Sequence, residues 1–188
     1  MKKVLFICHG NICRSPIAEY IMKSLTNDLY IESAATSTEE IGNHIYKSAQ
    51  DVLKRHNITN FSSKVARQVN KSDYNKFDYL VIMDEENRRG LMRIIDNDPS
   101  NKVIKLLDRD IDDPWYTRNF DKCYDDIYQG CKILLNKIMI ENVKKYLTQN
   151  PKIAEEIEQK VRDNYSKAFE NALADENELE DDEDDEEE

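Results

Sequence analysis

The residues Cys8, Arg14 and Ser15 lie on a short segment that joins an apolar run to a helical pattern. Cysteine is a nucleophile in its thiolate form, and an arginine can hold two oxygens of a phosphate at once. The N-terminus of the following helix presents unpaired backbone N–H groups and partial positive charge. The segment therefore predicts a cup in which a bound phosphate lies against a thiolate.

The loop residues fit a tight strand-to-helix connection. Ser15 is expected as the N-cap and Pro16 as the first helical residue, and Gly10 and Asn11 both tolerate a positive φ. Ser15 can also donate a hydrogen bond to a thiolate. The alternatives are a buried cysteine beside a stray arginine and a Walker-type nucleotide loop, but the latter needs a Gly-Lys-Ser/Thr ending that this segment lacks.

A second candidate lies near residue 113. A phenolic leaving group has to be protonated as it departs, and Asp113 is the candidate acid. Pro114 is expected to prevent a regular helix and to keep Asp113 on a loop. Trp115 and Tyr116 follow and could form the wall of a slot for a phenyl ring. The plainer alternative is an Asp-Pro turn whose aromatic residues cover the core.

Alternating elements are expected to position these residues. The patterns predict strands at 3–8, 30–36, 79–82 and 103–107, and helices at 16–26, 46–56, 85–95 and from about 120. This order indicates an α/β fold, an open four-stranded parallel sheet with helices on both faces. Cys8 would then end the first strand, at the edge where ligands bind in such sheets.

The C-terminal part departs from this pattern. A helical stripe continues to about Leu147, Asn150-Pro151 marks a break, and a second amphipathic helix follows. We therefore expect a domain over residues 1–148 and a helical extension over 149–174.

Residues 175–188 form an acidic tail. Twelve of these fourteen residues are Asp or Glu, so they account for the net charge of −11 and leave residues 1–174 near neutral. Charge at this density predicts disorder. The tail is expected to aid solubility, to compete with phosphopeptides for Arg14, or to bind a basic protein partner.

Composition limits the remaining possibilities. The first apolar run is too short for a signal peptide or a membrane span. Four cysteines, two of them on the candidate loop, indicate a reducing compartment and hence the cytoplasm. We expect no nucleic-acid partner and no membrane association.

Several segments together resemble the low-molecular-weight protein tyrosine phosphatases. Cys8-His9-Gly10-Asn11-Ile12-Cys13-Arg14-Ser15-Pro16 resembles their nucleophile loop, and Asp113-Pro114 resembles their general-acid loop. Ser33-Ala34-Ala35-Thr36-Ser37 is similar to their second strand, and Val65-Ala66-Arg67-Gln68 to a further family segment. The resemblance spans about residues 2–140.

The resemblance implies hydrolysis of phosphotyrosine in proteins, without a metal or cofactor. Cys8 would form a phosphocysteine, Arg14 would bind the phosphoryl group, and Asp113 would act as general acid and then general base. A supporting network would comprise Asn11, Ser15, Ser33 and Asp84. Cys13 would be a reversible disulfide partner that protects the nucleophile. The implied substrate-binding residues are His9, Gly10, Asn11, Ile12, Cys13, Ser15, Trp115 and Tyr116.

Three positions depart from the family pattern. Lys64 stands where a histidine often supports the network, so the network is expected to be arranged differently. Glu39 lies where many relatives have an aromatic residue, and it could repel acidic substrate flanks. His9 replaces an apolar residue, as a stacking group or as an exposed rim residue.

Neighbouring activities remain as alternatives. Arsenate reductases of this type need further cysteines near mid-chain, and none lies between Cys13 and Cys123. Phosphoarginine phosphatases carry a smaller polar residue at the position of Ile12. A phosphotyrosine-binding module with little turnover is the alternative from another class, and the presence of a complete acid and nucleophile pair argues against it.

Overall fold

The computed structural model describes the backbone of residues 1–181 and the side chains of residues 1–169. Its strands are β1 (Lys2–Cys8), β2 (Leu29–Ala35), β3 (Tyr79–Ile82) and β4 (Val103–Lys105). Its helices are α1 (Arg14–Leu25), α2 (Lys47–Arg55), α3 (Lys71–Lys76), α4 (Glu85–Ile95), α5 (Pro114–Thr117), α6 (Phe120–Gln149) and α7 (Pro151–Asp181). Within these residues one four-stranded sheet forms, in the order β2-β1-β3-β4 with every pair parallel, which confirms the predicted fold.

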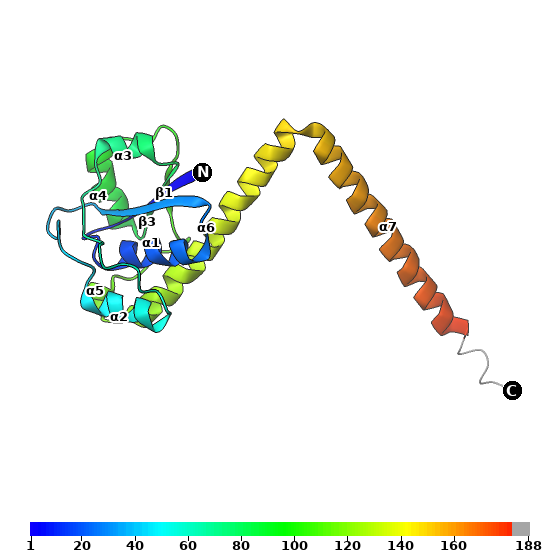
Figure 1. Ribbon diagram of the computed structural model, residues 1–188, viewed down its shortest axis with the longest axis horizontal. Helices are drawn as coiled ribbons and strands as arrows, with labels where there is room; N and C mark the ends of the chain where they lie inside the picture. Colours follow the sequence, from blue (N-terminus) through cyan, green and yellow to red (C-terminus); the bar gives the residue numbers. More distant parts are fainter. Residues whose placement is uncertain (182–188) are drawn as a thin grey trace. The chain divides into compact units, whose positions relative to one another are not determined.

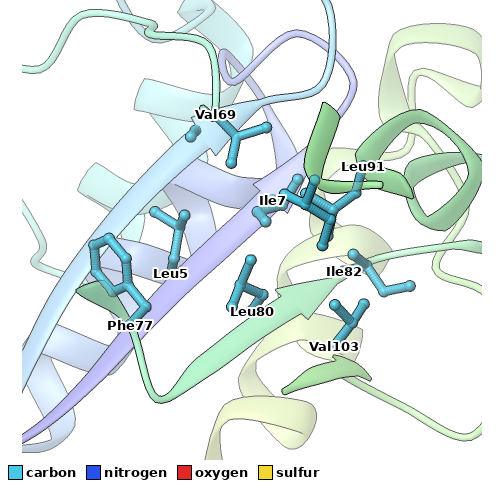
Figure 2. Close-up of a cluster of buried hydrophobic side chains, with 10 residues drawn as sticks. Leu5, Ile7, Val69, Phe77, Leu80, Ile82, Leu91 and Val103 are labelled. Carbon is cyan, nitrogen blue, oxygen red and sulfur yellow. The ribbon is translucent and has the colours of Figure 1, made fainter. Parts of the chain in front are cut away.

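Strand β1 lies inside the sheet and is buried on both faces from Val4 to Cys8. This explains its continuous apolar run, because a parallel strand is covered by helices on both sides. Leu5 and Ile7 belong to a core cluster that also includes Leu80 of β3 and Leu91 of α4 (Figure 2). Alternate residues point to opposite faces of the strand, so Phe6 and Cys8 belong to the other face.

Helices cover both faces of the sheet. Figure 1 shows α3 and α4 on one side, and α1, α2 and the first half of α6 on the other. Helix α6 approaches closely because Gly130 has no side chain, since a Cβ there would lie 2.5 Å from Leu106 Cγ. The sulfur of Cys131 lies 3.8 Å from the carbonyl of Ala18 on α1.

The chain order places a crevice at the end of β1. Strand β1 is followed in the chain by β2 on one side, and the chain then crosses to β3 on the other side. Ligands bind at such a switch point, beyond the carboxyl ends of the strands. Cys8 is the last residue of β1 and therefore lies at this point.

Helix α3 and strand β4 differ from the sequence expectations. Helix α3 was not predicted, because it is short and polar; a capping box formed by Asn70 and Asp73 starts it. Strand β4 ends at Lys105 rather than at residue 107, since Leu106 turns away to meet α6.

The C-terminal helices confirm the predicted break at Asn150-Pro151. Helix α6 ends at Gln149, and α7 begins at Pro151, where a proline is tolerated in the first turn. The structure divides into two compact units between Lys137 and Ile138, within α6. The domain boundaries at residues 148 and 174 stay predictions.

Helix α7 continues to Asp181 and so includes residues 175–181, which we predicted to be disordered. Its glutamates and Leu179 are favourable helix residues, which allows the helix to continue into the acidic segment. The rest of the predicted tail, residues 182–188, lies outside the described residues. None of the described helices has the length and apolarity needed to cross a membrane.

Candidate active site

The segment from Cys8 to Arg14 forms a tight loop between β1 and α1. Asn11 takes the left-handed conformation with a φ of 57°, as predicted, whereas Gly10 has no positive φ. A Cβ at Gly10 would lie 3.1 Å from Glu40 Cγ, so the glycine allows close approach of a neighbouring loop. The loop is therefore tight both in its backbone and in its packing.

The start of α1 corrects one expectation. The N-cap is Cys13 and the helix begins at Arg14, without a side-chain cap, whereas we predicted Ser15 as the cap and Pro16 as the first helical residue. The Ser15 hydroxyl instead faces the loop, 3.0 Å from the sulfur of Cys8. The uncapped, positive end of the helix therefore faces the predicted cup.

A buried hydrogen-bond network surrounds the Ser15 hydroxyl. Asn11 Nδ2 donates to Ser15 Oγ at 2.9 Å and to Ser33 Oγ at 2.8 Å. The Ser15 oxygen thus accepts one bond, and its own proton can point to Cys8 Sγ at 3.0 Å or to the more distant Ala34 carbonyl at 3.5 Å. The backbone N–H of Asn11 also donates to that sulfur, at 3.3 Å. Two donors therefore converge on the sulfur of Cys8.

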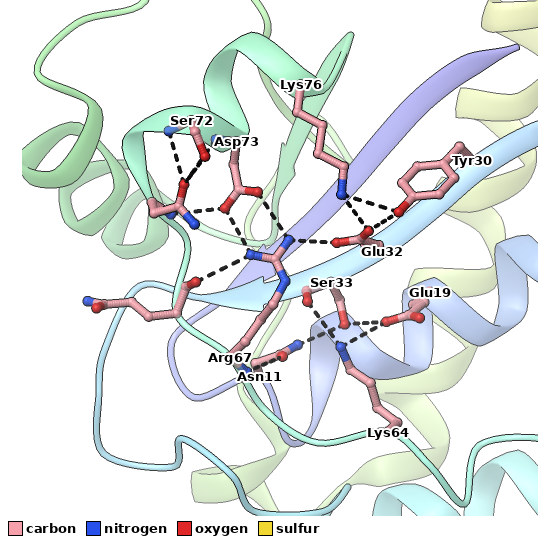
Figure 3. A network of polar contacts seen from close by, with 12 residues as sticks. Asn11, Glu19, Tyr30, Glu32, Ser33, Lys64, Arg67, Ser72, Asp73 and Lys76 are labelled. Carbon is pink, nitrogen blue, oxygen red and sulfur yellow. Dashed lines mark hydrogen bonds and ion pairs between the residues drawn. The ribbon is translucent and has the colours of Figure 1, made fainter.

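The network ends at a buried ion pair that the sequence reasoning missed. Ser33 Oγ donates to Glu19 Oε2 at 2.5 Å, and Lys64 Nζ lies 3.1 Å from the same oxygen (Figure 3). Lys64 also donates to the Ser33 carbonyl at 3.0 Å. Burial lowers the pKa of Lys64, although the Glu19 carboxylate opposes this shift. The departure at Lys64 is therefore part of the network.

Arg14 is almost completely buried, with 3% of its surface exposed. Its Nη1 donates to Asp84 at 2.5 Å and to the Ile111 carbonyl at 3.0 Å, and its Nη2 donates to Asp113 at 2.6 Å. Burial alone would lower the pKa of Arg14, but the neighbouring Cys8, Asp113 and Asp84 raise it. The Nε atom is buried without a hydrogen-bond partner, so Arg14 keeps an unused donor.

Two acids hold Arg14 from different loops. Asp84 also caps α4, since its Oδ1 accepts from Asn87 N at 2.6 Å. Asp113 caps α5 by accepting from Trp115 N at 3.0 Å. Pro114 therefore starts a one-turn helix rather than preventing one, which corrects our prediction, because proline fits the first helical position.

These residues border one cleft of about 650 Å³. Of the predicted substrate-binding residues, the cleft is lined by His9, Gly10, Ile12, Cys13, Trp115 and Tyr116, together with Cys8, Arg14 and Asp113. Asn11 and Ser15 are 1% and 0% exposed and are not among the residues that line the cleft, so their substrate-binding role stays a prediction. Ser33 is also fully buried, and the three side chains support the loop from below.

The aromatic and polar rim is more exposed than the floor. Trp115 contacts Tyr46 edge-to-face at 5.2 Å and is 39% exposed, whereas Tyr116 is 81% exposed. His9 lies 3.2 Å from Glu39, so two of the positions that depart from the family pattern pair with each other. The floor is thus fixed by the fold, while the rim is free to meet a ligand.

The other cysteines are buried in surroundings that keep them protonated. Burial raises the pKa of Cys13, and Cys8 and Asp113 raise it further. Burial likewise raises the pKa of Cys123 to about 12 and raises that of Cys131. These three thiols are neutral at neutral pH, so none of them is a ready nucleophile. The disulfide role of Cys13 stays a prediction.

A parallel α/β sheet with a cysteine and an arginine on the loop after its first strand is an arrangement typical of a phosphatase. Residues 3–147 match the family model described as low molecular weight phosphotyrosine protein phosphatase. The chain belongs to this family, and it is a hydrolase.

Individual relatives support this assignment over most of their length. The chain is 39% identical to the low molecular weight phosphotyrosine protein phosphatase of Gallus gallus, over 73% of this chain and 96% of the relative. It is 37% identical to the low molecular weight protein-tyrosine-phosphatase YfkJ of Bacillus subtilis, over 75% and 98%. The crystal structure of a Streptococcus pyogenes low molecular weight protein tyrosine phosphatase matches with a TM-score of 0.71 and 39% identity, over 73% of this chain and 93% of that one.

Proposed function

We propose that this protein hydrolyses phosphotyrosine in proteins through a cysteinyl-phosphate intermediate. The observation that carries the proposal is the placement of Arg14, buried beside Cys8 in the cleft with an unpartnered Nε. A buried donor without a partner is rare in a folded protein. A phosphate oxygen in the cleft would supply the missing acceptor.

The first step is attack of Cys8 Sγ on phosphorus. The sulfur–phosphorus bond forms while the bond to the phenolic oxygen breaks, and Asp113 gives its proton to that oxygen. Arg14 stabilises the charge that spreads over the phosphoryl oxygens. Arg14 Nη2 donates to Asp113, and a phosphoryl oxygen that accepted from Nη2 in its place would release the acid towards the leaving group.

The second step regenerates the enzyme. Asp113, now a carboxylate, takes a proton from a water molecule as that water attacks phosphorus. The sulfur–phosphorus bond breaks, inorganic phosphate leaves, and the Ser15 hydroxyl donates to the departing thiolate. Asn11 and Ser33 keep Ser15 in this orientation.

The cleft walls favour an aromatic phosphate ester. Ile12 supplies an apolar surface on the loop, and Trp115 and Tyr116 supply aromatic faces beside Asp113. A phosphotyrosine-binding module would not need an acid next to the nucleophile. This chain has no cysteine between Cys13 and Cys123, so it lacks the mid-chain cysteines that the disulfide shuttle of an arsenate reductase needs.

A phosphopeptide panel tests this function. Phosphotyrosine, phosphoserine, phosphothreonine and phosphoarginine peptides are offered to the wild type, Cys8→Ser and Asp113→Ala, and released phosphate is measured. We expect turnover of phosphotyrosine by the wild type, none by Cys8→Ser, and a large fall in Asp113→Ala. Wild-type protein that binds phosphotyrosine peptides without releasing phosphate would contradict the proposal.

Cellular setting and partners are part of the proposal. Free cysteines at positions 8, 13, 123 and 131 support activity in a reducing compartment such as the cytoplasm. The acidic residues 175–188 support a basic protein partner for the C-terminal tail.

A further inference from the structure

Carboxylates line the mouth of the cleft. Among the described residues of its lining, the permanent cations are Arg14 on the floor and Arg89 on the rim. Six carboxylate side chains surround the mouth, from the loop after β2, the start of α4 and the segment before Asp113: Glu39, Glu40, Glu85, Glu86, Asp110 and Asp112. A peptide whose phosphate reaches the floor has to pass along this acidic rim.

Nearby cations neutralise the acidic rim only in part. Lys105 is shared, since it lies 3.4 Å from Glu85 and 3.0 Å from Asp110. The lysines and arginines in ion-pair contact with the rim are Arg88, Arg89, Lys105 and Lys122, so carboxylates outnumber them. The rim therefore keeps a net negative charge.

Three of the rim carboxylates reach into solvent. The side chains of Glu39, Glu86 and Asp112 are 71%, 84% and 65% exposed. The partner of Glu39 is His9, whose own side chain is 56% exposed, so this pair can open towards a ligand. Cationic side chains of a bound peptide can therefore reach these carboxylates without burying them.

A separate observation supports a phosphate position at the floor of the cleft. Arg14 lines the cleft, only 3% of it is exposed, and its buried Nε lacks a hydrogen-bond partner. An oxyanion is the ligand that this donor fits. The phosphate thus lies at the floor, and the residues next to the phosphotyrosine lie at the acidic rim.

We propose that the substrates of this phosphatase carry lysine or arginine beside the phosphotyrosine, and that the acidic rim selects them. The inference rests on the proposed function and names its substrate class. Like charges at the rim repel acidic flanks, and opposite charges attract basic ones and steer their approach.

The expected preference is moderate and depends on salt. An exposed ion pair changes an equilibrium by about twofold to fivefold. Two such pairs predict a kcat/KM about tenfold higher for a basic peptide than for an acidic one at low ionic strength. At ~0.5 M salt the exposed charges are screened, so the ratio falls towards one.

The test compares two phosphotyrosine peptides of equal length, one with lysine and one with glutamate flanks, on the full chain. p-Nitrophenyl phosphate, which has no flanks, reports turnover independently. The rim variant Glu39→Gln/Glu86→Gln/Asp112→Asn removes three carboxylates. Its matched control, Glu155→Gln/Glu158→Gln/Asp163→Asn, removes the same charge from exposed positions of α7.

The expected result is a basic-to-acidic kcat/KM ratio of about ten in the wild type and in the α7 control, and a ratio near two in the rim variant. An equal or reversed preference in the wild type would overturn the inference, as would a ratio that the rim variant leaves unchanged. If p-nitrophenyl phosphate were not hydrolysed either, the proposed function would fail and this inference with it.

Discussion

Two arginines of this protein are each held between two carboxylates, but in different surroundings. Arg14 is held by Asp84 and Asp113, and Arg67 contacts Asp73 at 2.9 Å and Glu32 at 2.8 Å (Figure 3). Arg14 is buried at the floor of a cleft, whereas the Arg67 side chain is one-third exposed.

The partners of the two arginines explain this difference. Glu32 is part of β2, and Asp73 belongs to the capping box of α3, so Arg67 joins two structural elements. The acids around Arg14 come from loops beside the cleft, and its Nε stays unpartnered. The difference that points to a binding role is that Arg14 is buried and lines the cleft, whereas Arg67 is partly exposed and does not line it.

Matched substitutions at the two arginines test this distinction most strongly. Arg14→Lys removes the planar fork that fits a phosphate, and we expect kcat for p-nitrophenyl phosphate to fall about 10³-fold. Arg67→Lys should lower the melting temperature slightly, because a partly exposed ion pair contributes little to stability. It should change kcat less than about threefold, because Arg67 does not line the cleft. Similar losses of kcat in both variants would contradict the comparison.

Substitution of Asp113 separates its proton transfer from its contact with Arg14. Asp113→Asn keeps the shape but cannot donate a carboxylic proton, so turnover of phenyl phosphate should fall about 10²–10⁴-fold. The fall should be smaller for p-nitrophenyl phosphate, whose leaving group needs less protonation. Steady-state kinetics with the two esters measures this difference, and equal losses would remove the assignment as general acid.

The Lys64–Glu19 pair is buried, with side chains 11% and 5% exposed. Lys64→Met leaves the Glu19 carboxylate with Lys23 alone, 2.5 Å from its other oxygen, and we expect unfolding in urea to show a loss of up to about 3 kcal/mol. The double variant Lys64→Met/Glu19→Gln should recover part of that loss, because the buried carboxylate is removed and Lys23, whose side chain is 37% exposed, keeps its contact with water. The expectation would be contradicted if the double variant lost more free energy of unfolding than the two single variants lose together.

The smallest expected effect is the acid sensitivity of the Arg67 cluster. Burial would raise the pKa of Glu32, but hydrogen bonds from Lys76, Tyr30 and Arg67 outweigh it and lower the pKa to about 2. Glu32 therefore stabilises the fold above its ordinary pKa of 4.5, and this stabilisation is lost as the pH falls towards 2. We therefore expect the free energy of unfolding, measured in urea at several pH values between 2 and 4.5, to change less with pH in Glu32→Gln than in the wild type.

The sequence was informative where the evidence is local. The apolar run before Cys8 and the helical pattern after Pro16 predicted the strand, loop and helix that hold the nucleophile. The Asp113-Pro114 pair was predicted on a loop and lies beside the cleft, although Pro114 starts a short helix. The break at Asn150-Pro151 was also confirmed.

Contacts between distant parts of the chain were not predictable in the same way. Glu19 reads as an ordinary polar position on α1, and only the fold brings Ser33 and Lys64 to it. Asp84 and Asp113 are 70 and 99 positions from Arg14, so their joint hold on its guanidinium has no local signal. Helix α3 is a different case: the spacing of Asn70 and Asp73 is a local capping signal, but the helix was still not predicted because it is short and polar.

The central claim is that Cys8 forms the covalent intermediate, and acid-quenched reactions of Asp113→Ala with p-nitrophenyl phosphate test it most directly. A good leaving group allows the first step, while loss of the general base slows the second, so the intermediate should accumulate. Peptide mass spectrometry should locate one phosphoryl group on Cys8, retained in Cys13→Ser/Asp113→Ala and absent in Cys8→Ser/Asp113→Ala. A phosphoryl group on Cys13, or turnover without any labelled cysteine, would contradict the account.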